Sequence, residues 1–122
     1  MKFRKHFTSY RYAAKGIWQA FRYENNMRFH TLGAVLVVVF NYWLKVTANE
    51  WLISLLLIGV VWMAEVFNTA IEKLADRVTT EHDTLIGQVK DLASGAVLVI
   101  CIIAAVCGGI IYIPYLLQWW QQ

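Results

Sequence analysis

Three long apolar blocks limit what this chain can fold into. The first runs from about Phe29 to Val46, the second starts at Trp51, and the third runs from about Leu92 to Leu117. Each approaches the ~20 residues with which an α-helix crosses a bilayer. Hydrophobic residues make up 59% of the 122 positions, above the roughly 45–50% of a soluble domain. We therefore expect a single all-α integral membrane domain over residues 1–122.

The basic residues are distributed unevenly along the chain. Seven of the eleven precede the first block, three lie between the second and third, and only Lys45 lies between the first and second. By the positive-inside rule, the N-terminus and the second connection are cytoplasmic, and the C-terminus is external. Because the basic residues flank membrane blocks rather than forming a soluble basic face, we do not expect a nucleic-acid partner.

The first 28 residues predict an amphipathic helix on the membrane surface. Aromatic and apolar residues recur on one face, and basic residues occupy another. Two interpretations stay open, a membrane anchor and a lid over an active site. A polar run, Glu24–His30, follows this segment. Asn25 and Asn26 could simply break the helix and cap the next one, but Glu24 is the only acidic residue among the first 49, which favours a functional role.

A polar stripe enters the end of the second block. Glu65, Asn68, Glu72 and Asp76 follow spacings of three, four and four residues, which place them on one face of a helix. A carboxylate at membrane depth is costly and needs a bundle interior, a partner or an ion. Clustered carboxylates suit Mg²⁺ brought in with phosphates, and a carboxylate at the lipid boundary can take a proton from a lipid hydroxyl. These groups together favour phosphoryl transfer to a membrane alcohol.

Two other functions account for only part of this pattern. The common nucleotide-binding motifs are absent. A small proton-coupled transporter also depends on a membrane glutamate, although it usually has four spans. A membrane scaffold would leave the stripe unexplained. We also expect one three-span copy to leave the Glu65 stripe partly facing lipid, so that a closed ring of subunits would be needed to cover it.

The segment Glu65–Asp76, which reads EVFNTAIEKLAD, resembles the motif of the prokaryotic diacylglycerol kinase family, which includes undecaprenol kinase. The similarity covers roughly residues 5–105 and includes Lys90-Asp91 and Glu24-x-x-x-Arg28. It implies a homotrimeric helical bundle in the bacterial inner membrane, with active sites shared between subunits. Each subunit would have a surface helix over 1–28 and membrane helices over about 29–47, 51–77 and 86–117. The implied activity is transfer of the γ-phosphoryl group of ATP, with Mg²⁺ as cofactor, to the hydroxyl of a membrane lipid.

The resemblance also implies roles for individual residues. Glu65 would be the catalytic base, and Glu24 and Glu72 would hold Mg²⁺. The residues implied at the ATP site are Tyr12, Asn68, Asp76, Glu81, His82, Asp83, Lys90 and Asp91. Those implied at the lipid are Lys5, Trp18, Phe21, Arg28 and Ser94. Two features qualify the match: Lys5 stands where the diacylglycerol kinase pattern has Arg, and the Glu-Asn-x-x-Arg-x-His run is closer to the undecaprenol kinases.

Overall fold

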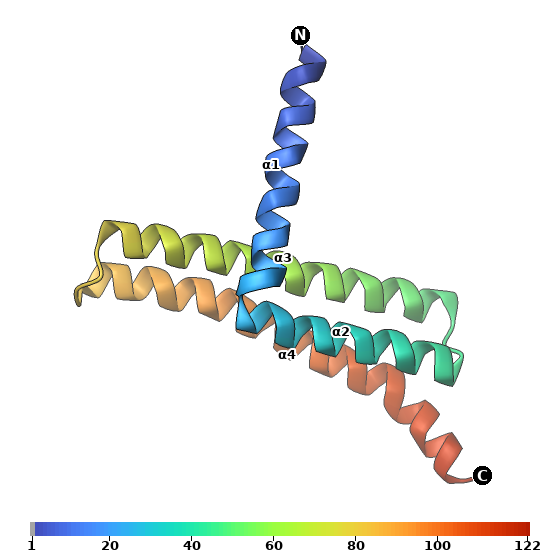
Figure 1. Ribbon diagram of the computed structural model, residues 1–122. Helices are drawn as coiled ribbons and strands as arrows, with labels where there is room; N and C mark the ends of the chain where they lie inside the picture. The colour runs from blue at the N-terminus through green and yellow to red at the C-terminus, as the bar shows by residue number, and fades with distance from the viewer. Residues whose placement is uncertain (1) are drawn as a thin grey trace.

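Four helices account for nearly all of the chain. The computed structural model describes residues 2–122, which form α1 (Lys2–Tyr23), α2 (Asn25–Leu44), α3 (Ala48–Val78) and α4 (Thr84–Trp120), with no strand in this range. Helices α2, α3 and α4 run side by side, and α1 leaves the bundle sideways (Figure 1). Each of these three is long and apolar enough to cross a membrane. The prediction of three membrane helices and an N-terminal helix is therefore confirmed.

The break between α1 and α2 comes earlier than the apolar pattern indicated. Glu24 has an extended backbone, with φ −94° and ψ 120°, and its side chain forms no capping hydrogen bond. The Arg28 guanidinium instead donates to the Arg22 carbonyl at the end of α1. This contact satisfies one of the carbonyls that a helix C-terminus leaves without a partner. The polar run after Glu24 therefore belongs to the first turns of α2 and not to a longer surface helix.

The turn between α2 and α3 is encoded locally. Lys45 adopts a left-handed conformation, with φ 52°, and ends α2. Thr47 Oγ1 then accepts a hydrogen bond from the Glu50 amide at 3.2 Å, and Glu50 Oε1 accepts one from the Thr47 amide at 3.0 Å. This reciprocal capping box starts a helix at the next residue. Helix α3 therefore begins three residues before Trp51.

Helices α3 and α4 extend beyond the length of a membrane span. They contain 31 and 37 residues, which correspond to about 46 Å and about 55 Å against a hydrocarbon core of ~30 Å. Asp83 caps the start of α4 by accepting a hydrogen bond from the Ile86 amide at 2.9 Å. Pro114 lies inside α4, and the helix continues to Trp120. Part of the α3–α4 pair must therefore project from the bilayer.

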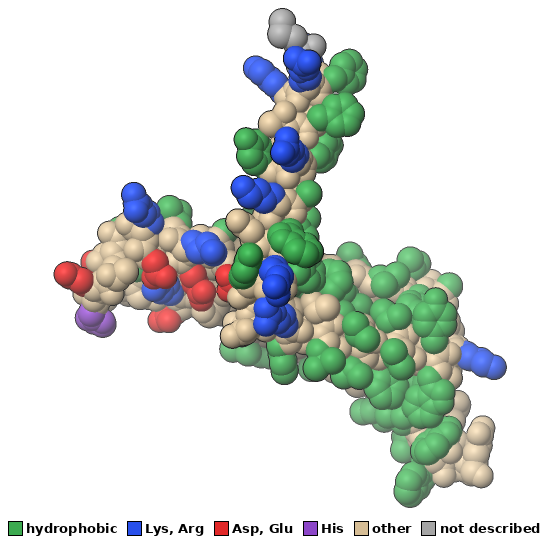
Figure 2. Space-filling model, viewed as in Figure 1, with side chains coloured by type: hydrophobic (Ala, Val, Ile, Leu, Met, Phe, Trp, Pro, Cys, Tyr) green, Lys and Arg blue, Asp and Glu red, His purple; other side chains and the backbone are tan. Residues whose placement is uncertain are grey.

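The distribution of side chains indicates which part projects. Charged side chains gather at the end of the bundle where α3 connects to α4, whereas apolar side chains cover the opposite part (Figure 2). Helix α1 stands at the border between the two regions. Its apolar side chains lie on the side of the apolar bundle surface, and its Lys and Arg side chains lie toward the charged end. This is the arrangement of an amphipathic helix at a membrane surface.

Candidate active site

The polar stripe lies on the inward side of α3 and becomes more exposed along the helix. Glu65 and Asn68 have exposed fractions of 2% and 4%. Glu72 is half-buried and receives a hydrogen bond from Asn68 Nδ2 to its Oε1 atom at 3.3 Å. Asp76 is exposed near the charged end of the bundle. The stripe thus leads from a buried carboxylate to an accessible one.

The burial of the stripe corrects one expectation from the sequence. The sequence predicts that a single copy leaves the stripe partly facing lipid. That expectation is wrong for Glu65 and Asn68, which the helices of one chain already cover. The reason is that α2 packs along this face of α3 and carries a polar residue to it. His30 Nε2 lies 3.5 Å from Glu65 Oε2, and the His30 side chain is only 14% exposed.

Two residues implied at the nucleotide site form an ion pair across the bundle. Lys90 Nζ on α4 lies 2.5 Å from Asp76 Oδ1 on α3. The two side chains are 39% and 55% exposed, so the pair contributes little to stability. Ser94 Oγ donates to the Lys90 backbone carbonyl at 3.0 Å, one turn earlier in α4. The Lys90 ammonium is a strong donor for a phosphate at this accessible position.

The remaining residues implied at the nucleotide site are spread over two regions. Glu81, His82 and Asp83 lie exposed in the connection between α3 and α4, and Asp91 lies exposed in the first turns of α4. The Asp83 carboxylate is already engaged as the cap of α4. Tyr12 is exposed on α1, the helix that leaves the bundle sideways (Figure 1). One chain therefore gathers the acidic residues at the charged end without bringing Tyr12 to them.

The two carboxylates implied as magnesium ligands are not brought together in one chain, because Glu24 lies between α1 and α2 and borders a face of α3 other than the one that carries Glu72. Glu24 lines a cavity of about 270 Å³ between α1 and α3, beside Val66, Thr69 and Lys73. These α3 positions are each offset by one residue from the stripe. Within residues 2–122, no group of three or more His, Cys, Asp or Glu side chains is arranged to hold a metal ion.

The donor atoms beside Glu72 nevertheless suit magnesium. Asn68 Oδ1 is buried and has no hydrogen-bond partner, although the amide of the same side chain donates to Glu72. An unpaired buried oxygen is costly unless a donor or a cation reaches it. Amide and carboxylate oxygens are the hard ligands that Mg²⁺ prefers, and the ion usually binds through one or two carboxylates plus substrate phosphates. The stripe therefore fits a magnesium ion that arrives with a nucleotide.

The residues implied at the lipid lie in several settings. Lys5 and Trp18 are exposed on the surface of α1. Phe21 packs edge-on against Trp62 of α3, with ring centroids 5.2 Å apart. Arg28 is engaged at the end of α1, so its side chain has a structural contact that sequence reasoning did not predict.

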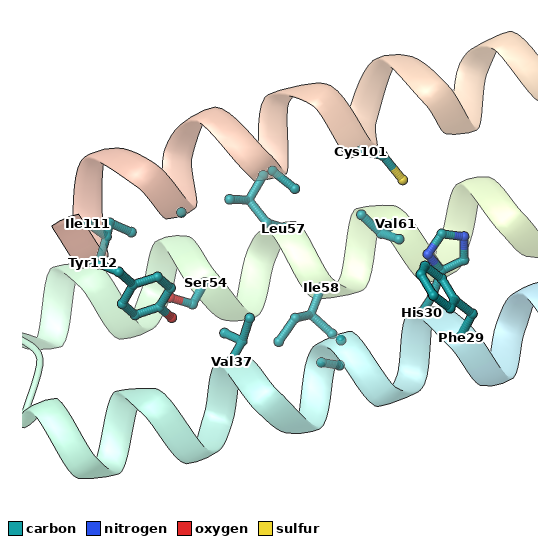
Figure 3. Close-up of a pocket in the computed structure, with 14 residues that line it drawn as sticks. Phe29, His30, Val37, Ser54, Leu57, Ile58, Val61, Cys101, Ile111 and Tyr112 are labelled. Atoms are coloured by element: carbon teal, nitrogen blue, oxygen red, sulfur yellow. The ribbon is translucent and has the colours of Figure 1, made fainter. Parts of the chain in front are cut away.

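An apolar cavity of about 200 Å³ lies between α2, α3 and α4 (Figure 3). Phe29, His30 and Val61 line one end, with Cys101 facing them from α4, and Ser54 and Tyr112 line the other end. An apolar cavity of about 150 Å³ is large enough to bind a molecule of benzene. The cavity is therefore large enough for part of a hydrocarbon chain, and it is lined by His30, the residue that contacts Glu65.

Sequence reasoning gave no separate role to His30. The structure brings it to Glu65 from 35 positions away. The available signal was its place at the end of the polar run Glu24–His30, which contains more polar groups than a connection at a membrane surface requires.

Comparison with known proteins identifies the family of this chain. The family model described as prokaryotic diacylglycerol kinase matches residues 11–112. The undecaprenol kinase of Bacillus subtilis is 38% identical over 110 residues, which cover 90% of this chain and 89% of the relative. The diacylglycerol kinase of Escherichia coli is 34% identical over 95 residues, or 78% of each chain. That of Haemophilus influenzae is 30% identical over 85% of this chain and 89% of the relative. The chain therefore belongs to the prokaryotic diacylglycerol kinase family.

Proposed function

We propose that this chain is a membrane lipid kinase that transfers the γ-phosphoryl group of Mg-ATP to a lipid hydroxyl, with Glu65 as the general base. The observation that carries the proposal is the graded stripe of α3. A carboxylate that is 2% exposed stands at its inner end, and an accessible Asp76–Lys90 pair stands at its outer end. In this proposal, an acceptor from the bilayer approaches the inner end of the stripe, and a nucleotide from water binds at the outer end.

The proposed reaction needs one proton acceptor. Glu65 takes the proton as the lipid O–H bond breaks, and the lipid oxygen forms a bond to the γ-phosphorus. The bond from that phosphorus to the bridging oxygen breaks, and ADP leaves with the electron pair. The proton then passes from Glu65 to solvent before the next cycle. A positioned base of this kind contributes typically about 10²–10⁴-fold, and positioning and charge stabilisation supply the rest.

The charged end of the bundle binds the nucleotide in this proposal. Glu24 and Glu72 hold the magnesium ion, which neutralises negative charge on the phosphates when bound. Asn68 offers its unpaired oxygen beside Glu72, and Lys90 binds a phosphate oxygen. The other residues assigned to the nucleotide are Tyr12, Asp76, Glu81, His82, Asp83 and Asp91. Lys5, Trp18, Phe21, Arg28 and Ser94 are assigned to the lipid side.

The proposed working form is a homotrimer with sites shared between subunits. Within one chain, Glu24 borders a face of α3 offset from Glu72, and Tyr12 stands on the projecting α1. A neighbouring subunit supplies these groups if the chains associate around a symmetry axis. The proposed orientation in the bacterial inner membrane places the charged end of the bundle in the cytoplasm, where ATP is available.

The proposed acceptor is a polyprenol, specifically undecaprenol. The undecaprenol kinase of Bacillus subtilis shares 38% identity with 90% of this chain, compared with 36%, 34% and 30% for the diacylglycerol kinases of Synechocystis, Escherichia coli and Haemophilus influenzae. The run Glu24-Asn-x-x-Arg28-x-His30 favours the same branch.

A panel of acceptor lipids tests this function. Purified protein in liposomes is given ATP labelled at the γ-phosphate, with undecaprenol, diacylglycerol or no added alcohol. We expect label in the lipid extract only when an alcohol is present, with undecaprenol preferred. A preference for diacylglycerol would correct the acceptor and keep the reaction. Substrate movement driven by a pH gradient, with no labelled lipid from any acceptor, would instead favour a proton-coupled transporter.

A further inference from the structure

The apolar cavity between α2, α3 and α4 has no role in the proposed reaction. Its volume is about 200 Å³. Ser54 and Tyr112 lie at one end, and His30 lies at the other (Figure 3). The lining residues Ser54 and Val61 of α3 are seven positions apart, which corresponds to about 10 Å along the helix. The cavity therefore extends along the three helices that are long and apolar enough to cross a membrane.

The hydroxyl groups at one end of the cavity are already engaged. The Tyr112 hydroxyl donates to Asn41 Oδ1 on α2, and the Ser54 hydroxyl donates to the Glu50 carbonyl. A buried water molecule needs about two to four polar partners, and most of the other lining residues are apolar. The lining therefore favours an apolar occupant over water.

The surroundings of the cavity supply such an occupant. Apolar side chains cover this part of the bundle (Figure 2), so that its solvent is the hydrocarbon of the bilayer. Phe29 is 74% exposed and Gly33 is also exposed, and both line the cavity. Side chains around an empty space lack dispersion contacts on one side, and an entering chain restores these contacts. A lipid chain is therefore the occupant that fits the cavity.

The other end of the cavity leads toward the proposed base. Glu65 is 2% exposed, so an acceptor hydroxyl cannot approach it across an open surface of α3. His30 lines the cavity, and its Nε2 atom lies 3.5 Å from Glu65 Oε2. A chain that fills the cavity with its alcohol at this end has its hydroxyl on the side of Glu65.

We infer that the cavity is the chain-binding subsite of the acceptor lipid and holds the part of one hydrocarbon chain next to the hydroxyl. This inference rests on the proposed function, because the bound alcohol is the acceptor of the phosphoryl group. An apolar cavity of about 150 Å³ holds one molecule of benzene, so a cavity of about 200 Å³ holds a segment of one chain. The site therefore selects an alcohol on a single chain, such as a polyprenol, whereas the second chain of a diacylglycerol must stay in the bilayer.

Neighbouring glycines of α4 provide a matched pair of variants. Gly108 lines the cavity, and Gly109 does not. A Cβ atom added at either position meets no atom closer than 3.7 Å, and leucine favours a helix more than glycine does. Gly108→Leu therefore narrows the cavity, and Gly109→Leu makes the same change outside it.

The kinetic test uses the full-length protein in liposomes with a long polyprenol and with prenol, which has a single isoprene unit. Gly108→Leu should lower kcat/KM for the polyprenol by about 10-fold or more. The KM for Mg-ATP and the kcat/KM for prenol should stay within about twofold of the parent. Prenol is spared because Gly108 is seven residues from Cys101, at the His30 end, or about 10 Å along α4. Gly109→Leu should match the parent with both alcohols.

A photoreactive polyprenol tests the binding without relying on turnover. The probe carries a diazirine on its second isoprene unit, and the labelled peptides are identified after irradiation. We expect label on cavity residues such as Val37, Leu57 and Ala104, with about 10-fold less label in Gly108→Leu and parental label in Gly109→Leu. If thermal unfolding shows that Gly108→Leu does not fold, Ala104→Leu narrows the same cavity, with the exposed neighbour Ala105→Leu as its control.

The outcomes separate this inference from the proposed function. If the parent phosphorylates the polyprenol but the probe labels only residues outside the cavity, the chain subsite alone fails. It also fails if the cavity variant keeps parental kcat/KM, or loses activity equally with prenol and the polyprenol. If the parent phosphorylates no lipid alcohol, the proposed function fails, and the assignment of the cavity to an acceptor fails with it.

Discussion

Glu65, Asn68 and Glu72 share one face of α3 but lie in different environments. Glu65 is buried against α2, whereas Glu72 is half-buried and bonded to Asn68. Seven residues separate the two carboxylates, or about 10 Å along a helix axis. This distance is too long for both to bind one magnesium ion on a straight helix, which leaves Glu65 free for proton transfer while Glu72 holds the ion.

The first prediction concerns the metal. Glu24→Gln and Glu72→Gln each remove a hard anionic ligand and keep the side-chain shape. Each should raise the Mg²⁺ concentration for half-maximal activity by about 10-fold. Glu50→Gln is the control, because Glu50 caps the other end of α3, and it should leave the Mg²⁺ dependence unchanged. Parental Mg²⁺ dependence in both test variants would remove these residues from the metal site.

The sequence predicted the residues of the stripe but not the contact at its inner end. Helical spacing alone places Glu65, Asn68 and Glu72 on one face. The approach of His30 depends on how α2 packs against α3, and spacing within one helix contains no information about packing. The engagement of Arg28 with the Arg22 carbonyl was missed for a related reason, since it depends on where α1 ends.

At the scale of helices, the sequence predicted the number and order of the helices better than it predicted their lengths. Hydropathy marks where a helix meets the membrane border, and a helix can continue past that border. Helix α2 therefore begins at Asn25 and α4 at Thr84, within segments too polar to be counted as spans. The starts of α3 and α4 coincide with capping residues, Thr47 and Asp83, so local chemistry defines these boundaries.

The second prediction tests the start of α3. Thr47→Ala removes the hydroxyl that accepts from the Glu50 amide, and it should lower the free energy of unfolding by about 1 kcal/mol. Thermal unfolding in detergent micelles measures the change. Thr80→Ala, at an exposed position of the α3–α4 connection, is the control and should unfold like the parent. Equal melting of the Thr47 and Thr80 variants would mean that the capping box contributes nothing measurable.

At the scale of the whole molecule, one end of the bundle is charged and the other is apolar. Helix α1 stands at the border with its basic side chains toward the charged end (Figure 2). Lys45 is the only basic residue between α2 and α3. An excess of Lys and Arg marks the cytoplasmic side of a membrane protein, so the charged end should face the cytoplasm.

The third prediction concerns this orientation. In a background with Cys101 and Cys107 changed to alanine, Gln121→Cys should react with a membrane-impermeant thiol reagent in intact cells. Thr80→Cys should react only after permeabilisation. The reverse pattern of labelling would place the charged end outside and contradict the proposed access to ATP.

The fourth prediction concerns shared sites. At a Mg²⁺ concentration that limits Glu24→Gln, the Glu24→Gln and Glu65→Gln variants should each have little activity alone, and their co-assembly should restore activity. If each site takes Glu24 from one subunit and Glu65 from its neighbour, random mixing in equal amounts should restore about a quarter of parental activity. Co-assembled trimers that remain inactive would mean that both residues act within one chain.

The most direct test of the whole account is the turnover of Glu65→Gln. Glutamine keeps the size of the side chain and can still form hydrogen bonds, but it cannot accept the proton of the lipid hydroxyl. We predict that transfer of labelled phosphate to lipid falls by about 10²–10⁴-fold, while thermal unfolding, trimer formation and Mg-ATP binding stay near parental values. Turnover within a fewfold of the parent would contradict the account and leave Glu65 as a structural partner of His30.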